Sequence, residues 1–265
     1  MTDEPQIWHY GLMAERWAKS INDTPELVFY EKQIEKFGQP VLDVACGTGR
    51  LLLALLRAGI DMDGCDLSKD MLQFCRQRVQ QEGFHAHLME QPMHAFQSPR
   101  TYKTIYVCDS FGLAGSREKD LETLRCCYGH LESGGALIFN IQAEYADPGT
   151  WQLWLEENRQ HLPQAWPQEG SRRVAADGSE NIATFRTVEF DPLEQRYTRQ
   201  VRLEKWVKGE LVRSEEYSLR GNMYFKNEVK LMLEVAGFEN IAVYGDYQLE
   251  PASTENQEII FIATK

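Results

Sequence analysis

The chain has 265 residues, with 40 Asp and Glu against 28 Lys and Arg, so its formal net charge is −12. Hydrophobic residues make up 43% and charged residues 26%, values typical of globular proteins and unlike those of disordered, fibrous or membrane proteins. The longest aliphatic run, residues 51–56, is far shorter than the roughly 20 residues that a membrane span needs. The acidic charge argues against broad nucleic-acid binding, which requires a basic surface.

The start of the chain and its cysteines predict a compartment. The first five residues, Met-Thr-Asp-Glu-Pro, include no apolar segment, which argues against a secretory signal. Six cysteines lie between residues 46 and 127, and none forms a Cys-x-x-Cys pair. Three disulfides would match the even count, but a chain of this length can build a core without them. We therefore expect reduced thiols and a cytoplasmic protein. The spacing of the histidines and cysteines does not suit zinc, so no metal is expected.

The predicted elements, in chain order, indicate an α/β fold. Residues 1–39 are predicted to be helical. Strands then alternate with helices: the strands cover 40–46, 61–66, 85–90, 103–108 and 136–141, and the helices cover 50–58, 68–82 and 117–131. Ser68 is a predicted helix N-cap, Gly59 and Gly83 are predicted helix stops, and Gly134-Gly135 is predicted to end the third helix. Such alternation predicts a parallel sheet with helices on both faces.

The alternation stops after residue 141. Residues 151–166 are predicted to be partly helical, and three strand-like stretches follow at 182–191, 196–207 and 211–219, with Pro192 and Gly209 at the hairpin turns. A helix over 227–236 and strands over 241–244 and 258–263 complete the chain. We therefore predict an α/β domain formed by residues 1–142 and 223–265. A small antiparallel β insert, residues 143–222, interrupts it as a lid or substrate subdomain.

Two aspartates and a glycine turn carry the clearest chemical signal. Asp43 lies in the first strand, which runs into Gly47-Thr48-Gly49, and glycines between a strand and a helix let backbone N–H groups approach a ligand. A dinucleotide-binding Gly-x-Gly-x-x-Gly pattern fails, because Leu52 stands at its third glycine. Asp66 ends the second strand, where a carboxylate can accept hydrogen bonds from both hydroxyls of a ribose.

Four segments together resemble class I S-adenosylmethionine-dependent methyltransferases of the type that acts on small molecules. They are residues 42–49 (LDVACGTG), 64–71 (GCDLSKDM), 131–135 (LESGG) and 228–238 (EVKLMLEVAGF). The resemblance implies a Rossmann-like seven-stranded methyltransferase sheet whose last strand is antiparallel. It also implies S-adenosylmethionine as the cofactor, at the carboxyl ends of the first strands.

The resemblance also implies the residues around the cofactor. Those expected to contact it are Tyr10, Trp17, Asp43, Ala45, Gly47, Gly49, Asp66, Leu67, Met71, Gln91, Met93 and Asp109. Asp43, Ala45 and the two glycines belong beside the methionine part. Asp66 belongs on the ribose, Leu67 and Met71 beside the adenine, and Tyr10 or Trp17 near the sulfonium. Pro92 departs from the family pattern, because relatives often carry there an acid that meets the adenine amino group. Gln91 or Glu90 is the expected substitute.

The acceptor side is less defined. The fourth strand ends at Cys108, where neither the Asn/Asp-Pro-Pro-Tyr pattern of base-amino methyltransferases nor a cytosine-methylating nucleophile is present. Ser110, Arg220 and Tyr224 are the expected substrate contacts. No catalytic residue is assigned, because positioning alone can supply roughly 7–11 kcal/mol of the acceleration. His94 is a weaker candidate for a general base.

The sequence thus favours methyl transfer to a nitrogen or oxygen of a small molecule, and it leaves a homodimer possible. Three alternatives stay open. An RNA or protein methyltransferase is disfavoured by the net charge of −12. A nicotinamide-dependent oxidoreductase is disfavoured by the missing third glycine. A methyltransferase-like binding protein without turnover is kept open by Pro92.

Overall fold

The computed structural model describes residues 9–20 and 23–265. Within the region 1–39 that was predicted to be helical, α1 (Gly11–Ser20) and α2 (Leu27–Phe37) are helices. Residues 1–8 and 21–22 belong to the same prediction and lie outside the described residues. No described helix is both long and apolar enough to cross a membrane.

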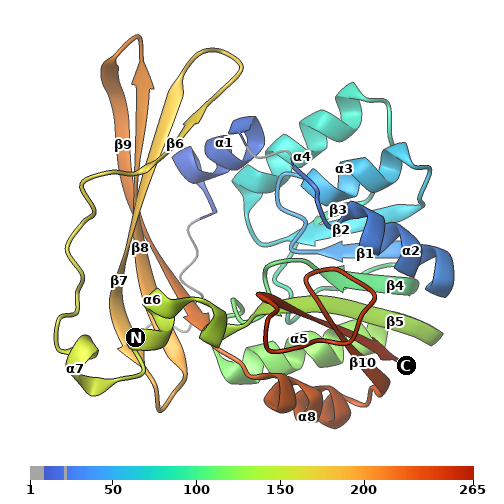
Figure 1. Ribbon diagram of the computed structural model, residues 1–265. Helices are drawn as coiled ribbons and strands as arrows, with labels where there is room; N and C mark the ends of the chain where they lie inside the picture. Colours follow the sequence, from blue (N-terminus) through green and yellow to red (C-terminus); the bar gives the residue numbers. More distant parts are fainter. Residues whose placement is uncertain (1–8, 21–22) are drawn as a thin grey trace.

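The larger sheet has seven strands in the order β10-β11-β5-β4-β1-β2-β3 (Figure 1). Their bounds are β1 Val41–Val44, β2 Met62–Asp66, β3 Leu88–Glu90, β4 Tyr102–Val107, β5 Leu131–Gln142, β10 Glu239–Gly245 and β11 Glu258–Thr264. Neighbours from β3 to β5 pair in parallel, whereas β11 is antiparallel to both β5 and β10. The predicted seven-stranded sheet with an antiparallel last strand is confirmed.

Helices cover both faces of this sheet, and its central strands are therefore buried on both sides. One apolar cluster joins the sheet to α2, α3 (Arg50–Arg57) and α4 (Lys69–Gln81), and Leu52, Leu55 and Leu72 are fully buried in it. A second cluster joins the other face to α5 (Arg117–His130) and α8 (Lys226–Ala236), through residues such as Leu124 and Leu233. Figure 1 shows the two helical layers. Ser68 caps α4 as predicted, accepting a hydrogen bond from Met71 N.

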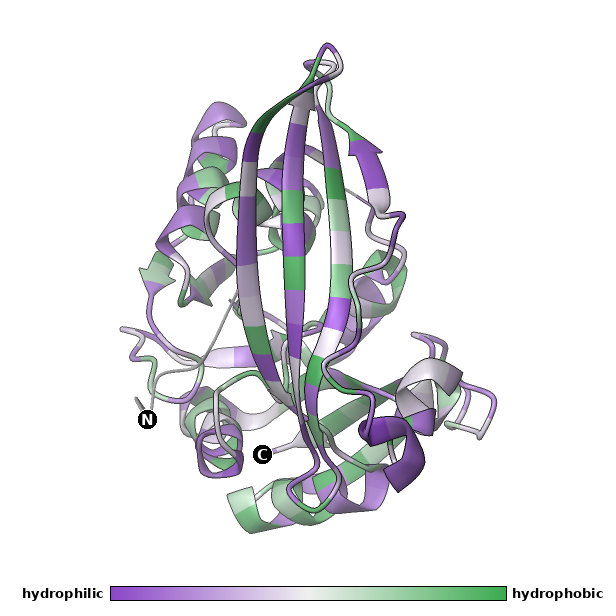
Figure 2. Ribbon diagram, turned by 90° about the vertical axis from the view of Figure 1, so that its left-hand side faces the viewer, coloured by the Kyte–Doolittle hydropathy of each residue, from purple (hydrophilic) through white to green (hydrophobic). Residues whose placement is uncertain are grey.

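A separate antiparallel sheet lies between β5 and β10 in the chain, with the order β6-β7-β8-β9. Its strands are β6 Ser171–Val174, β7 Glu180–Asp191, β8 Arg196–Val207 and β9 Glu210–Asn222, and the turns after β7 and β8 contain Pro192 and Gly209 as predicted. Three short helices precede it: η1 (Glu144–Ala146), α6 (Pro148–Gln152) and α7 (Glu156–Arg159). Figure 2 views the long strands of this sheet face-on. The division of the chain into two domains stays a prediction.

The structure differs from the predicted elements at three places. Strand β6 was missed, because its four residues are exposed and show no apolar alternation. The prediction that Gly134-Gly135 end the helix is wrong: α5 ends at His130 and β5 begins at Leu131, continuing through both glycines. The third strand is Leu88–Glu90, shorter than the predicted 85–90.

Helix α1 joins the two sheets. Leu12 and Met13 pack into an apolar cluster with Val201, Leu203 and Tyr217 of the smaller sheet. At the start of the helix, the backbone N–H of Gly11 donates to Asp70 of α4 at 2.8 Å. Figure 1 shows α1 between the smaller sheet and α4. The helix therefore fixes the space between the sheets.

A buried carboxylate makes a second connection between the sheets. Asp120 of α5 is fully buried and accepts hydrogen bonds from Tyr224 Oη at 2.7 Å, Asn222 Nδ2 at 2.7 Å and Ala114 N at 3.2 Å. These donors belong to the end of β9, the segment after it and the loop before α5. Asp120 therefore ties the return of the chain from the smaller sheet to the larger one.

We expect Asp120→Ala to lower the free energy of unfolding by about 3 kcal/mol, because three donors, two of them on buried residues, lose their acceptor. Urea denaturation monitored by fluorescence would measure this change. Glu122→Ala, at an exposed position of the same helix, is the control and should change it by less than about 0.5 kcal/mol. Equal free energies of unfolding in the two variants would contradict a stabilising role for the hydrogen bonds of Asp120.

Candidate functional site

The carboxyl ends of β1, β2 and β4 meet at one edge of the larger sheet and line a cavity there. The turn after β1 places Ala45 and Gly47 at positive φ angles of 61° and 56°. A Cβ on Gly47 would come within 3.4 Å of the Met71 side chain. The turn thus exposes backbone to the cavity, which is the arrangement that suits close approach of a ligand.

Gly49 has a different part in this turn. It is the N-cap of α3, with φ of 80°, and a Cβ there would lie 2.7 Å from Cys75 Sγ. It is not among the residues that line the cavity. Its small size therefore allows α3 to pack on α4, and it is not a direct wall of the site.

Asp66 ends β2 and lines the cavity. Its Oδ2 accepts a hydrogen bond from Gly47 N at 2.8 Å, and its Oδ1 accepts one from Ser68 N at 2.7 Å. Burial raises the pKa of Asp66 to about 6, although both backbone bonds oppose that rise. A carboxylate has about four acceptor positions, so each oxygen retains capacity for a ligand hydroxyl.

Asp43 lies within β1 and lines the same cavity. Its side chain lines the cavity although the residue is only 3% exposed. Burial raises the pKa of Asp43 to about 8. The site therefore favours the neutral acid until a positive charge arrives, and a cationic ligand group would restore the carboxylate.

The structure brings most of the predicted cofactor residues together. Those that line the cavity are Trp17, Asp43, Ala45, Gly47, Asp66, Leu67, Met71, Gln91, Met93 and Asp109. Gly49 and Tyr10 are not among its lining residues, and Tyr10 is exposed, with its ring edge-on to Tyr217. Gln91 faces the cavity, but its amide is bonded to the backbone of Gln97 through both ends. Pro92 and His94 also line the cavity.

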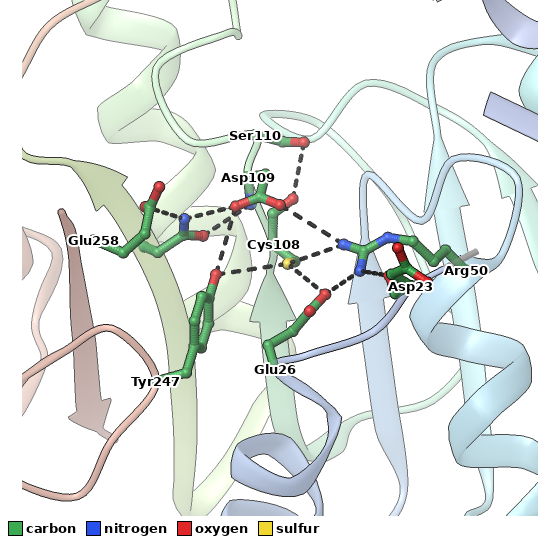
Figure 3. A network of polar contacts seen from close by, with 9 residues as sticks. Asp23, Glu26, Arg50, Cys108, Asp109, Ser110, Tyr247 and Glu258 are labelled. Atoms are coloured by element: carbon green, nitrogen blue, oxygen red, sulfur yellow. Dashed lines mark hydrogen bonds and ion pairs between the residues drawn. The ribbon is translucent and has the colours of Figure 1, made fainter. Parts of the chain in front are cut away.

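A polar network at the end of β4 surrounds Cys108 (Figure 3). Arg50 forms ion pairs with Glu26 and, at 3.7 Å, with Asp109 Oδ2. Burial raises the pKa of the Cys108 thiol well above its usual value, so the thiolate is disfavoured. This agrees with a structural role for Cys108. All six cysteines are free thiols.

A second cavity, with a volume of about 320 Å³, adjoins the first and lies between the larger sheet and the smaller one. Four residues line both cavities: His9, Trp17, Asp109 and Leu113. Burial lowers the pKa of His9 to about 4, so its imidazole is neutral near pH 7. The two cavities therefore share a wall.

Asn140 of β5 organises this shared wall. Its Nδ2 donates to Asp109 Oδ1 at 2.7 Å and to Glu258 Oε2 at 2.8 Å, and its Oδ1 accepts from Asp109 N at 2.8 Å. These bonds hold Asp109 in a left-handed conformation, with φ of 55°. Figure 3 shows Asp109 between Glu258 on one side and Arg50 on the other.

The three predicted substrate residues have different positions. Ser110 lines the first cavity and donates its hydroxyl to Cys108 O at 3.1 Å. Tyr224 lines the second cavity, and its hydroxyl donates to Asp120. Arg220 lines neither cavity.

Sequence reasoning missed several residues of the second cavity: His9, Asn140, Glu144, Tyr197 and Glu258. They are far apart in the chain, and no motif links them. Asn140 did carry a signal, since it is the polar residue inside the otherwise apolar stretch 136–141. A buried amide in such a place must find hydrogen-bond partners.

Comparison with known proteins shows what the chain is similar to. Residues 41–135 match the family model described as a methyltransferase domain. A provisionally named methyltransferase of Geobacillus sp. (strain WCH70) is 22% identical over 97% of this chain and 99% of its own length. The ubiquinone biosynthesis O-methyltransferase of Aliivibrio fischeri (strain MJ11) is 27% identical over 52% of this chain and 62% of its own. A solved sugar N-methyltransferase from Streptoalloteichus sp. shares the fold, with a TM-score of 0.66 and 17% identity, over 91% of this chain and 84% of its own.

We expect Asp43→Asn to stabilise the ligand-free protein at pH 8 by on the order of 2 kcal/mol. The pKa of Asp43 is about 8 in the folded chain against an ordinary 3.8, so the stability that this group contributes falls as the pH rises through that window. The gain should therefore shrink towards pH 4. Urea denaturation across this range would measure it, with Asp61→Asn as an exposed control. A variant no more stable than the native chain at pH 8 would contradict the burial argument.

Proposed function

We propose that the chain is a class I S-adenosylmethionine-dependent methyltransferase that methylates a nitrogen or oxygen of a small molecule, which its match to a methyltransferase domain supports. The observation that carries this proposal is the shared wall between two cavities. One cavity has the residues that the cofactor requires, and the other offers enclosed space for an acceptor. Methyl transfer needs the two partners in line and in contact, which is what adjoining cavities allow.

The residues of the first cavity fit the cofactor chemically. In this proposal Asp43 meets the ammonium group of the methionine part, because a cation restores its carboxylate. Asp66 accepts hydrogen bonds from the ribose hydroxyls, and Leu67 and Met71 pack on the adenine. Gln91 is bonded to Gln97, so the adenine would rely on apolar contacts and backbone groups beside Pro92.

S-adenosylmethionine supplies a methyl group on a positively charged sulfur. The chain's own contribution is to orient the acceptor and to exclude water, which together account for several kcal/mol of the barrier. Trp17 lies at the junction of the cavities, where an aromatic face stabilises a cation by about 0.5–2 kcal/mol. Helix α1 carries Trp17, so its docking on the smaller sheet and on α4 completes the site.

A methyltransferase-like binding protein without turnover is the second candidate, and Pro92 is the observation that favours it. Release of S-adenosylhomocysteine during incubation with S-adenosylmethionine and a panel of small amines and alcohols distinguishes the two. Product release with any member supports the enzyme. Cofactor binding without product across the panel, together with capture of a stable protein partner, would favour the binding protein.

Asp66→Ala should weaken binding of S-adenosylhomocysteine by about 1.5–3 kcal/mol, because charge-assisted hydrogen bonds to the ribose are lost. Isothermal titration calorimetry measures the affinity. Asp61→Ala, just before the opposite end of the same strand, is the matched control and should leave the affinity unchanged. An unchanged affinity in Asp66→Ala would show that this residue does not bind the ribose. Absence of binding to the native chain would refute the proposed function itself.

A further inference from the structure

We propose that the acceptor carries a basic amine, which the carboxylates of the second cavity hold and Glu258 deprotonates. This inference rests on the proposed function and narrows it to methylation at nitrogen. It starts from the charges around the cavity. Asp109, Glu144 and Glu258 line it, and its described lining residues include no lysine or arginine. A cavity with this lining favours a cationic ligand over a neutral or anionic one.

The three carboxylates differ in what already compensates them. Arg199 lies near Glu144 and opposes the rise in its pKa, and that guanidinium also lies over the Tyr197 ring at 4.7 Å. Asp109 forms an ion pair with Arg50 at 3.7 Å, on the side of the first cavity. Among the hydrogen bonds and ion pairs found for Glu258, the side-chain partner is the neutral amide of Asn140. Glu258 is therefore the carboxylate most in need of a cation.

Asn140 keeps two of these carboxylates together. A single amide group donates to Asp109 and to Glu258, so their oxygens are held on either side of one nitrogen. Two like charges so close are unfavourable in a partly buried site. Burial and the nearby Asp109 raise the pKa of Glu258 to about 7. A ligand ammonium group would relieve this repulsion, whereas a ligand carboxylate would add to it.

Aromatic rings supply the rest of the wall. Trp17, Phe111, Tyr197 and Tyr224 line the cavity, and their faces suit the carbon skeleton of a small molecule or the flank of a cation. The acceptor class is therefore an amine on a compact carbon frame.

The carboxylates also solve a chemical problem, because an ammonium group has no lone pair. One N–H proton passes to the carboxylate of Glu258, which lines the same cavity. The freed lone pair forms the C–N bond to the methyl carbon as the C–S bond breaks, and that electron pair stays on sulfur. The products are the methylated ammonium ion, S-adenosylhomocysteine and the protonated Glu258, so charge and atoms balance.

The test uses three probes of one shape: benzylamine, benzyl alcohol and benzoate. Calorimetry measures the binding of each to the full chain saturated with S-adenosylhomocysteine. We expect benzylamine to bind at least tenfold more tightly than the other two. Benzoate or the alcohol binding as well as the amine, or no binding by any of the three, overturns the inference. Binding of S-adenosylhomocysteine in the same samples reports separately on the proposed function.

Two variants with the same loss of charge locate the effect. Glu258→Gln should reduce the preference for benzylamine about tenfold or more, the range for a charge-assisted hydrogen bond, with the affinity for S-adenosylhomocysteine unchanged. Glu239→Gln, exposed on the neighbouring strand β10, should keep the full preference. An equal preference in the two variants would remove Glu258 from the acceptor site. Thermal melts of both variants verify folding.

Discussion

The structure depends on the placement of acidic side chains where parallel strands end. Asp43 is the penultimate residue of β1, Asp66 ends β2, and Asp109 lies just after β4, so their carboxyl groups converge at one edge of the sheet. Burial there disfavours charge, and it raises the pKa of Asp43 and of Asp66. The protein tolerates this arrangement because backbone N–H groups and Asn140 bond to two of the three carboxylates. The edge is thereby prepared for a ligand that brings positive charge and hydrogen-bond donors.

The second sheet turns that edge into an enclosed site. Without it, the carboxyl ends of the strands would face solvent on the side of Glu258 and Tyr224. Helix α1 fills the angle between the sheets, and its Arg16 donates to Asn181 O at 3.0 Å while Leu12 is buried against β8 and β9. Asp120 makes the other connection, by accepting hydrogen bonds from Tyr224 and Asn222. The shared wall of the two cavities is therefore a product of packing between elements that are distant in the chain.

Local patterns predicted much of the larger sheet. In β1, the glycine turn and the leucine-rich α3, the residues favour the structure that each segment adopts. Their order along the chain could therefore be predicted from the sequence. The predictions failed where local signals were weak or were overridden. Exposed β6 shows no alternation, and Gly134 and Gly135 look like a helix stop but lie in β5, where their backbone groups form hydrogen bonds with the backbone of Lys265. Tyr10 was a reasonable aromatic candidate, but its ring packs edge-on against Tyr217.

The sequence by itself determined the class of fold and the position of the cofactor motifs, because Asp43, Gly47 and Asp66 lie within one continuous strand-turn-helix-strand segment. Their mutual placement follows from parallel pairing of adjacent strands, which local pattern encodes. Only the tertiary structure decided the second cavity. Its lining residues come from distant parts of the chain: His9 precedes α1, Asn140 lies in β5, Tyr197 in β8 and Glu258 in β11. No spacing in the chain relates them. They meet because two sheets and a helix pack together. Packing between elements that are distant in the chain cannot be predicted from any short segment.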